Sequence, residues 1–148
     1  MTTEKMSDPP HSCRWLVVDD DPAVLEFIAQ ILRGIPGSEV VACDNPCQAL
    51  KVFSAAPESF ELLVTDFDMP GLDGIQLARH VRAGFSRVQI LLISGSEVQA
   101  TDALSAGVDA FLPKPFPVKE LLAMVRGLIN QCDRAEGWPR RRIQFWES

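Results

Sequence analysis

The stretch "LLVTDFDMPGLDG" (residues 62–74) places two carboxylates, Asp66 and Asp68, directly after a short apolar run. A run of this kind that stops at acids and glycines is typical of a buried strand followed by a loop. An uncompensated charge at such a position is costly. The two acids therefore either anchor the loop or carry out chemistry, and the rest of the chain has to decide between these two interpretations.

The same pattern recurs along the chain, because five apolar segments alternate with segments of helical spacing. The strands are predicted within residues 15–21, 39–43, 61–65, 88–94 and 109–115. The helices are predicted to begin at Pro22, Pro46, Ile75, residue 97 and Pro117, and the fourth is expected to end near residue 105, before Gly107. This alternation predicts an α/β protein with a doubly wound (βα)5 flavodoxin-like fold, in which helices cover both faces of a five-stranded parallel sheet.

Length and composition restrict the function. A chain of 148 residues with 47% hydrophobic and 23% charged residues is typical of one globular domain. The net charge of −6 disfavours nucleic acid as the main partner, so no direct DNA binding is expected. No apolar run reaches the roughly 20 residues that cross a bilayer, and the first residues have no signal-peptide core. We therefore expect a cytoplasmic protein without membrane insertion. Its four cysteines are expected to be reduced thiols.

Polar side chains stand where the predicted strands end. Asp19 and Asp20 follow the first strand, Asp66 the third, Ser94 the fourth and Lys114 the fifth. In a parallel α/β sheet these carboxyl ends meet at one edge, where ligands bind. No glycine-rich loop follows the first strand, so a dinucleotide site is not expected.

The converging acids require a counterion. Two carboxylates about 4 Å apart repel by roughly 4 kcal/mol at an effective dielectric constant of 20. Lys114 supplies one positive charge, and a divalent cation would supply the rest. Oxygen ligands favour Mg²⁺ or Mn²⁺ over zinc. Acids around such a cation, beside a lysine and a hydroxyl, also form a phosphoryl site in which one carboxylate is the nucleophile.

Four segments together carry a resemblance to a known family. In their order and spacing, "VVDDD", "VTDFDMPGLDG", "LLISGS" and "FLPKPF" resemble the receiver domain of bacterial two-component response regulators. The resemblance covers residues 15–131. It implies a receiver domain over residues 14–132, preceded by a tail at 1–13 and followed by a basic and aromatic tail at 133–148.

The resemblance assigns the metal site and the nucleophile. Asp66 would be the phosphoacceptor for a sensor histidine kinase or a histidine phosphotransfer protein. Asp20 and Asp66 would bind Mg²⁺ (or Mn²⁺) directly, together with the backbone carbonyl of Asp68, and Asp19 would act through water. The domain would catalyse its own phosphorylation and dephosphorylation, without being an enzyme that acts on a separate substrate.

The resemblance also assigns the groups that respond to phosphate. Ser94 and Lys114 would bind phosphoryl oxygens, Ser94 and Phe111 would form the switch pair, and the bond between Lys114 and Pro115 would be cis. Three positions depart from common family residues. Asp68 stands where Asn is often found, Ser96 carries no charge, and Phe111 lacks the hydroxyl of a tyrosine.

Several polar residues have simpler interpretations. Asp21, before Pro22, is expected to cap a helix, Asp73 to serve as a turn or cap residue, and His80 to lie on the surface. Fifteen residues after the last helix cannot hold a helix-turn-helix domain. The expected function is therefore a stand-alone receiver that switches a surface read by a downstream protein target.

Three alternatives remain at the level of the sequence. The domain could be a phosphorelay intermediate that passes its phosphoryl group to a second histidine. It could be a degenerate receiver, although it retains every residue that the chemistry requires. Residues 66–68 also resemble the D-x-D motif of haloacid dehalogenase-type phosphatases. This alternative is remote, because those enzymes begin with the D-x-D strand and place an acidic pair after the lysine, whereas here the acidic pair comes first.

Overall fold

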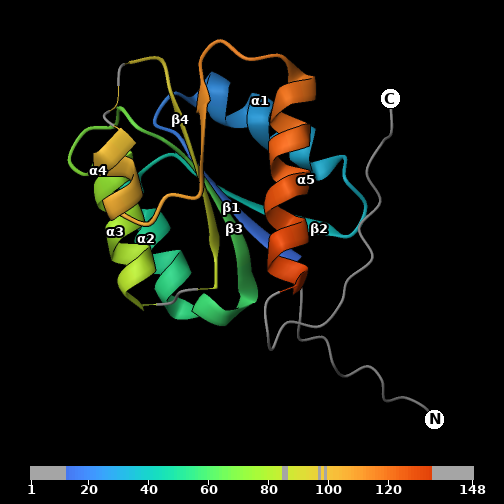
Figure 1. Ribbon diagram of the computed structural model, residues 1–148, viewed down its shortest axis with the longest axis horizontal. Coiled ribbons are helices and arrows are strands. Elements are labelled where there is room, and N and C mark those ends of the chain that lie inside the picture. Colours follow the sequence, from blue (N-terminus) through green and yellow to red (C-terminus); the bar gives the residue numbers. More distant parts are fainter. Residues whose placement is uncertain (1–12, 85–86, 97, 99, 135–148) are drawn as a thin grey trace.

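The computed structural model of the protein describes residues 13–84, 87–96, 98 and 100–134 (Figure 1). In this part of the chain, strands and helices alternate from end to end. The strands are β1 (Cys13–Val18), β2 (Ser38–Cys43), β3 (Phe60–Asp66), β4 (Gln89–Ser94) and β5 (Ala110–Pro113). The helices are α1 (Pro22–Arg33), α2 (Pro46–Ala55), α3 (Gly74–Gly84), α4 (Ala100–Ser105) and α5 (Val118–Arg134), with a short 3₁₀ helix at Pro57–Ser59.

The five strands form one parallel sheet in the order β2-β1-β3-β4-β5. Helices α1 and α5 cover one face of the sheet, and α2, α3 and α4 cover the other (Figure 1). The predicted doubly wound α/β fold is therefore confirmed. The order reverses between β1 and β3, which is the topological position where ligands bind in such sheets.

Alternating strand residues supply two separate cores. Leu16, Leu63 and Leu92 belong to the cluster that includes residues of α2 and α3, whereas Trp15 and Val64 belong to the cluster that includes residues of α1 and α5. The three central strands are buried on both faces, which explains their nearly continuous apolar runs. The polar residues that these strands do carry lie mainly at their ends.

Side-chain caps determine where the helices begin. The Asp21 carboxylate accepts from Ala23 N at 2.9 Å, with Pro22 at the first helical position of α1, so the predicted cap is confirmed. At α3 the cap is reciprocal. Gln76 N donates to Asp73 Oδ1, and Asp73 N donates to Gln76 Oε1, both at 2.8 Å.

Some boundaries differ from the predicted ones. Helix α4 is described only from Ala100 to Ser105, and residues 97 and 99 of the predicted helix lie outside the described residues. Helix α5 begins at Val118, one residue after Pro117, and continues to Arg134. The predicted tail before residue 13 and the basic and aromatic residues 135–148 also lie outside the described residues.

Two smaller expectations concern cysteines and membrane spans. Cys43 is buried, Cys47 is exposed, and both are free thiols. The side chains of Cys13 and Cys132 lie outside the description. None of the described helices is long and apolar enough to span a bilayer.

Candidate functional site

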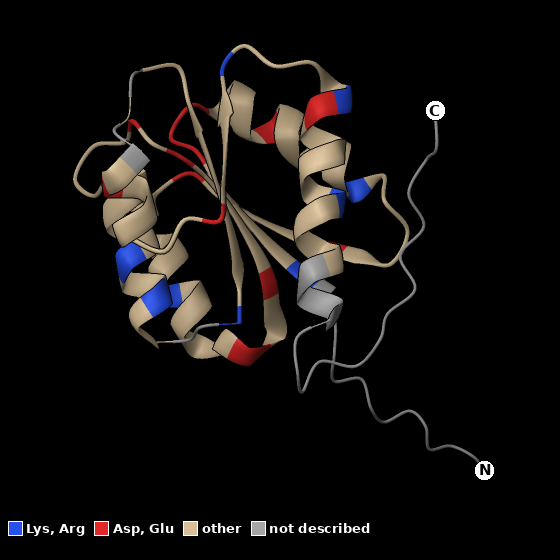
Figure 2. Ribbon diagram, viewed as in Figure 1, with Lys and Arg blue, Asp and Glu red and all other residues tan. Residues whose placement is uncertain are grey.

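The strand register brings the predicted site residues to the same level of the sheet. Val18 pairs with Thr65, so Asp19, the residue after β1, comes next to Asp66, the last residue of β3. At the other side of β3, the last residue of β4, Ser94, pairs with Pro113 of β5, which directly precedes Lys114. Figure 2 shows acidic segments in the loops at this end of the sheet, which is the upper end in the view.

Three carboxylates and one lysine meet at this edge. Oxygens of Asp19, Asp20 and Asp66 all lie within 4.8 Å of one another. Asp19 and Asp66 are buried, with exposed fractions of 1% and 5%, whereas Asp20 is exposed. Lys114 Nζ lies 2.9 Å from Asp66 Oδ1 and 3.6 Å from Asp19 Oδ2. The structure thus gathers four of the predicted site residues around one point.

The donor set of this cluster fits a divalent cation. Asp19 Oδ1 accepts a hydrogen bond from Asp21 N at 2.9 Å. Asp19 Oδ2 is buried and has no hydrogen-bond partner within the described part of the chain. Three carboxylates and one ammonium leave a charge of −2 (−3 + 1), and all the available ligand atoms are oxygens. A hard divalent ion such as Mg²⁺ suits both the charge and the ligands.

The electrostatics of the site follow from burial and charge. Burial raises the pKa of the Asp66 carboxyl above its ordinary value, although the hydrogen bond from Lys114 acts in the opposite direction. Burial also raises the pKa of Asp19, against the hydrogen bond from the Asp21 backbone. For Lys114, burial lowers the pKa, but the bond to Asp66 and the charges of both buried carboxylates outweigh it, so the net shift is upward. One lysine therefore compensates the acids only in part.

A glycine allows the backbone to pass close behind Asp66. Gly74 begins α3, and its N–H donates to Phe67 O at 2.9 Å. A Cβ atom at this position would stand 2.3 Å from Asp66 O and 2.7 Å from Leu92 Cδ1. The loop from β3 can return this closely to the end of its own strand only because residue 74 has no side chain.

Ser94 lies at the end of β4 but does not contact the carboxylates through any hydrogen bond that we observe. Its Oγ donates to Ser96 O at 3.1 Å and accepts from Ser96 N at 2.9 Å. Ser96 Oγ in turn donates to Asp68 Oδ2 at 2.5 Å. The sequence had predicted a role only for the backbone carbonyl of Asp68. The parallel pairing of β3 with β4 was the signal for this side-chain contact, because it places the two following loops next to each other.

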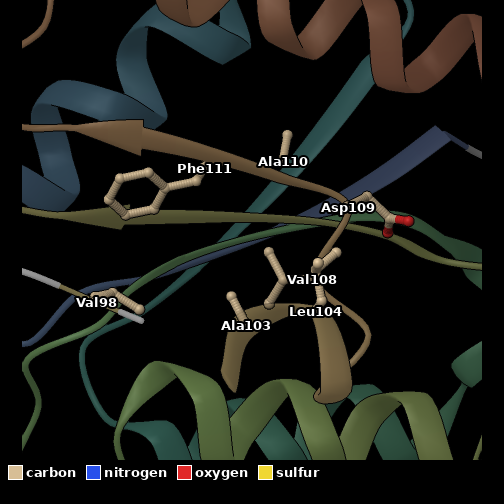
Figure 3. Close-up of a pocket in the computed structure, with 7 residues that line it drawn as sticks. All are labelled: Val98, Ala103, Leu104, Val108, Asp109, Ala110 and Phe111. Atoms are coloured by element: carbon tan, nitrogen blue, oxygen red, sulfur yellow. The ribbon is translucent and has the colours of Figure 1, made fainter. Parts of the chain in front are cut away.

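Phe111 lies on β5 with its ring directed outward and 37% exposed. It lines a pocket of about 320 Å³ between β5 and α4, whose other walls include Val98, Ala103, Leu104 and Val108 (Figure 3). The pocket is largely apolar and lies beside β5, which ends at Pro113 directly before Lys114. The predicted role of Phe111 as a switch residue stays a prediction.

The residues with simpler interpretations are placed as expected. Asp21 is exposed and caps α1, and Asp73 caps α3. His80 is exposed on α3, where its Nδ1 lies 3.0 Å from Gln76 O. The bond between Lys114 and Pro115 is cis, as the resemblance implied.

Residues 15–126 match the family model of the response regulator receiver domain. The chain belongs to the response regulator receiver family. The response regulators MprA of Mycobacterium tuberculosis and Mycobacterium ulcerans are 36% and 37% identical to it over 135 and 122 residues, which are 88% and 81% of this chain. These segments are 57% and 51% of the two proteins, so this receiver spans about half the length of either relative.

Solved structures agree with this assignment. A receiver domain protein from Clostridium thermocellum superposes with a TM-score of 0.75 at 25% identity, over 80% of this chain and 95% of the other. A CheY-like receiver protein from Methanospirillum hungatei gives 0.75 at 26% identity, over 82% and 97%. Receivers of response regulators are signalling domains that interact with histidine kinases, and they generally bind Mg²⁺ at an acidic pocket. Asp19, Asp20 and Asp66 form such a pocket in this receiver.

Proposed function

We propose that Asp66 accepts a phosphoryl group from a phosphohistidine on a sensor kinase or a phosphotransfer protein, in a reaction that depends on Mg²⁺. The observation that carries this proposal is the contact between Asp66 Oδ1 and Lys114 Nζ at 2.9 Å inside the acidic pocket. The carboxylate is buried on the strand side, but it lies at the open carboxyl edge of the sheet, where a partner's imidazole can approach.

The proposed reaction is a transfer between two nucleophiles. A carboxylate oxygen of Asp66 forms a bond to phosphorus while the bond from phosphorus to the histidine nitrogen breaks, and its electron pair returns to the imidazole. Lys114 exchanges its contact with Asp66 for one with a phosphoryl oxygen, and its raised pKa keeps the amine protonated. Ser94 supplies a hydroxyl to a second phosphoryl oxygen.

The metal would be held by residues that already surround the nucleophile. Asp20, Asp66 and the backbone carbonyl of Asp68 would bind Mg²⁺, and Asp19 would act through water. When bound, the ion neutralises charge on the phosphoryl oxygens. The buried Asp19 Oδ2, which has no hydrogen-bond partner among the described residues, supports a role for this side chain toward a cation.

Phosphorylation would reach a downstream protein through Ser94 and Phe111. As Ser94 turns toward the phosphoryl group, the ring of Phe111 would leave its outward position beside the pocket of about 320 Å³. This movement changes the apolar surface formed by α4 and β5. A protein partner that reads this surface would then distinguish the two states.

Acetyl phosphate with Mg²⁺ tests the central step without a kinase. Intact-mass spectrometry should show a phosphoryl-sized gain that hydroxylamine removes and that is absent in Asp66→Asn. Asp44→Asn, an exposed aspartate that follows β2, is the matched control and should retain the gain. Persistence of the gain in Asp66→Asn would move the site elsewhere, and no gain in the wild type would reject the proposal. Turnover of ordinary phosphate esters would favour the phosphatase alternative.

A further inference from the structure

A chain of three contacts links Ser94 to the loop that follows Asp66. The Ser94 hydroxyl is held by the backbone N–H and carbonyl of Ser96. The Ser96 hydroxyl is held by the carboxylate of Asp68. Asp68 belongs to the loop after β3 and Ser96 to the loop after β4, so the contacts join the two loops that border the acidic pocket.

The first contact decides where the Ser94 proton points. A serine hydroxyl has one proton to donate. In this structure Ser94 Oγ donates it to Ser96 O at 3.1 Å and therefore directs none toward Asp66. Ser94 is only 1% exposed, so its environment is provided by the protein. To donate to a phosphoryl oxygen, the hydroxyl has to leave the backbone of residue 96.

The third contact, between Ser96 and Asp68, decides how firmly residue 96 is held. A hydroxyl that donates to a carboxylate at 2.5 to 2.7 Å forms a charge-assisted bond, roughly twice as strong as a neutral one. The distance of 2.5 Å between Ser96 Oγ and Asp68 Oδ2 falls at the short end of this range. The backbone that captures Ser94 is thus tied to a loop that is anchored by the start of α3.

We propose that Asp68 and Ser96 are positioning residues that hold the Ser94 hydroxyl away from Asp66 until a phosphoryl group arrives. We call this pair the Asp68–Ser96 latch. The inference rests on the proposed function, because it assumes that Ser94 binds the phosphoryl group. It adds a regulatory role for two side chains that neither bind the phosphate nor touch the nucleophile.

Phosphorylation has a physical means to open the latch. The Asp68 carboxylate is near enough to Asp66 for its charge to raise the pKa of that group, after the larger effect of burial. A phosphoryl group on Asp66 adds negative charge at the same edge and repels Asp68. The same charge attracts the proton of Ser94. Both effects favour the state in which the latch is open and Ser94 faces the phosphate.

The affinity for beryllium fluoride, measured with saturating Mg²⁺, tests the latch, because this mimic of an aspartyl phosphate requires the same movement of Ser94. Ser96→Ala keeps the backbone that binds Ser94 but loses the tie to Asp68. We expect this variant to bind beryllium fluoride about tenfold more tightly than the wild type. This factor corresponds to the lower end of the free-energy range for a hydrogen bond to a charged group. Ser96→Thr retains a hydroxyl and should restore the wild-type value. Ser105→Ala removes an exposed hydroxyl that donates to Asp102 O within α4, and it is the matched control.

A double-mutant cycle separates the latch from other effects. Asp68→Ala removes both the bond and a negative charge, so it should tighten binding at least as much as Ser96→Ala. If Ser96 acts through Asp68, then Ser96→Ala should have no further effect in the Asp68→Ala background. If Ser96→Ala tightens beryllium fluoride binding by the same factor in the wild type and in Asp68→Ala, then Ser96 acts independently of Asp68. This result would overturn the proposal.

The remaining outcomes distinguish the latch from the proposed function. If the wild type binds beryllium fluoride but Ser96→Ala binds it equally well or more weakly, the latch is rejected and the phosphoacceptor role stands. If no variant binds the mimic or gains a phosphoryl group, the proposed function fails. In that case NMR of the free protein still tests the latch, because Ser96→Ala should change the χ1 rotamer population of Ser94. An unchanged population rejects the latch.

Discussion

The polar groups at the two ends of the central sheet differ in how completely they are paired. At the amino end of β4 and β5, Arg82 donates to Val88 O, Gly107 O and Asp109 Oδ2, each at 2.7 Å. Asp109 Oδ2 also accepts from Ile90 N at 2.8 Å. At the carboxyl end, three carboxylates cluster beside one lysine that pairs with Asp19 and Asp66, and Asp19 Oδ2 has no hydrogen-bond partner within the described chain.

The difference is what we expect if the amino end contributes stability and the carboxyl end carries the proposed site. The Arg82 network joins α3 to the residue before β4 and to the turn before β5, and it pairs a cation with an anion and with the carbonyls of Val88 and Gly107. The acidic pocket lacks this balance, and a divalent cation would supply it. Sites whose polar groups lack hydrogen-bond or charge partners are expected to be functional, and the rest of the fold supplies the stability.

The largest expected effect is on chemistry at the carboxyl end. Lys114→Met should lower the rate of phosphorylation by acetyl phosphate about 100-fold, because it removes the positive charge beside the developing phosphoryl charge. Lys119→Met, on the exposed surface of α5, should leave the rate unchanged. The rates can be followed by intact-mass spectrometry. A Lys114→Met rate within twofold of the wild type would show that Lys114 is not part of the phosphoryl site.

The amino end should respond in stability instead. Arg82→Ala is expected to lower the free energy of unfolding by about 2 kcal/mol, because several hydrogen bonds to part-buried groups are lost together. Arg79→Ala, on the exposed side of the same helix, should change it by less than about 0.5 kcal/mol. Urea unfolding at pH 7 measures both variants. The comparison between the two ends fails if Arg82→Ala changes the phosphorylation rate more than the stability.

A smaller effect of opposite sign is expected at Asp19. Burial raises the pKa of Asp19 above its ordinary value, so its contribution to stability is present below the pKa of the unfolded state and is lost as pH rises through the folded pKa. At pH 7 without Mg²⁺, Asp19→Asn should therefore increase the free energy of unfolding by about 1 kcal/mol. The gain should vanish near pH 3, where the wild-type carboxyl is protonated in both states.

Mg²⁺ provides the control for this prediction. Addition of the ion should stabilise the wild type more than Asp19→Asn, because the variant has lost one acid of the cation pocket. Asp44→Asn, which lies outside the pocket, should behave as the wild type in both conditions. Destabilisation by Asp19→Asn at pH 7 would mean that its contact with Lys114 outweighs the cost of burial.

The sequence was most informative where a signal is local. Apolar runs that end in acids, small residues or a proline-rich turn predicted all five strands, and proline after a capping residue predicted the starts of α1 and α2. The convergence of Asp19, Asp66 and Lys114 followed from one further inference, that the ends of parallel strands meet at one edge. The structure confirms this geometry, while the roles of these residues in phosphoryl transfer stay predictions.

Contacts between distant side chains could not be predicted in the same way. Arg82 and Asp109 are 27 residues apart, and Ser96 and Asp68 are 28 residues apart. No spacing rule connects such pairs, because their contact depends on strand register and on the path of two loops at once. The orientation of Phe111 was equally inaccessible, since a residue on an edge strand can pack inward or outward without changing the apolar pattern.

The close approach of Gly74 to the carbonyl of Asp66 restricts which substitutions residue 74 can accept during evolution. Every single-base change in a glycine codon that alters the residue either adds a Cβ atom or stops translation. At residue 74 any such atom would meet backbone 2.3 Å away, directly behind the acceptor. At Gly127, on α5, a Cβ would meet nothing within 4 Å. We therefore expect lineages that keep phosphoryl chemistry to retain glycine at 74 and to exchange it freely at 127.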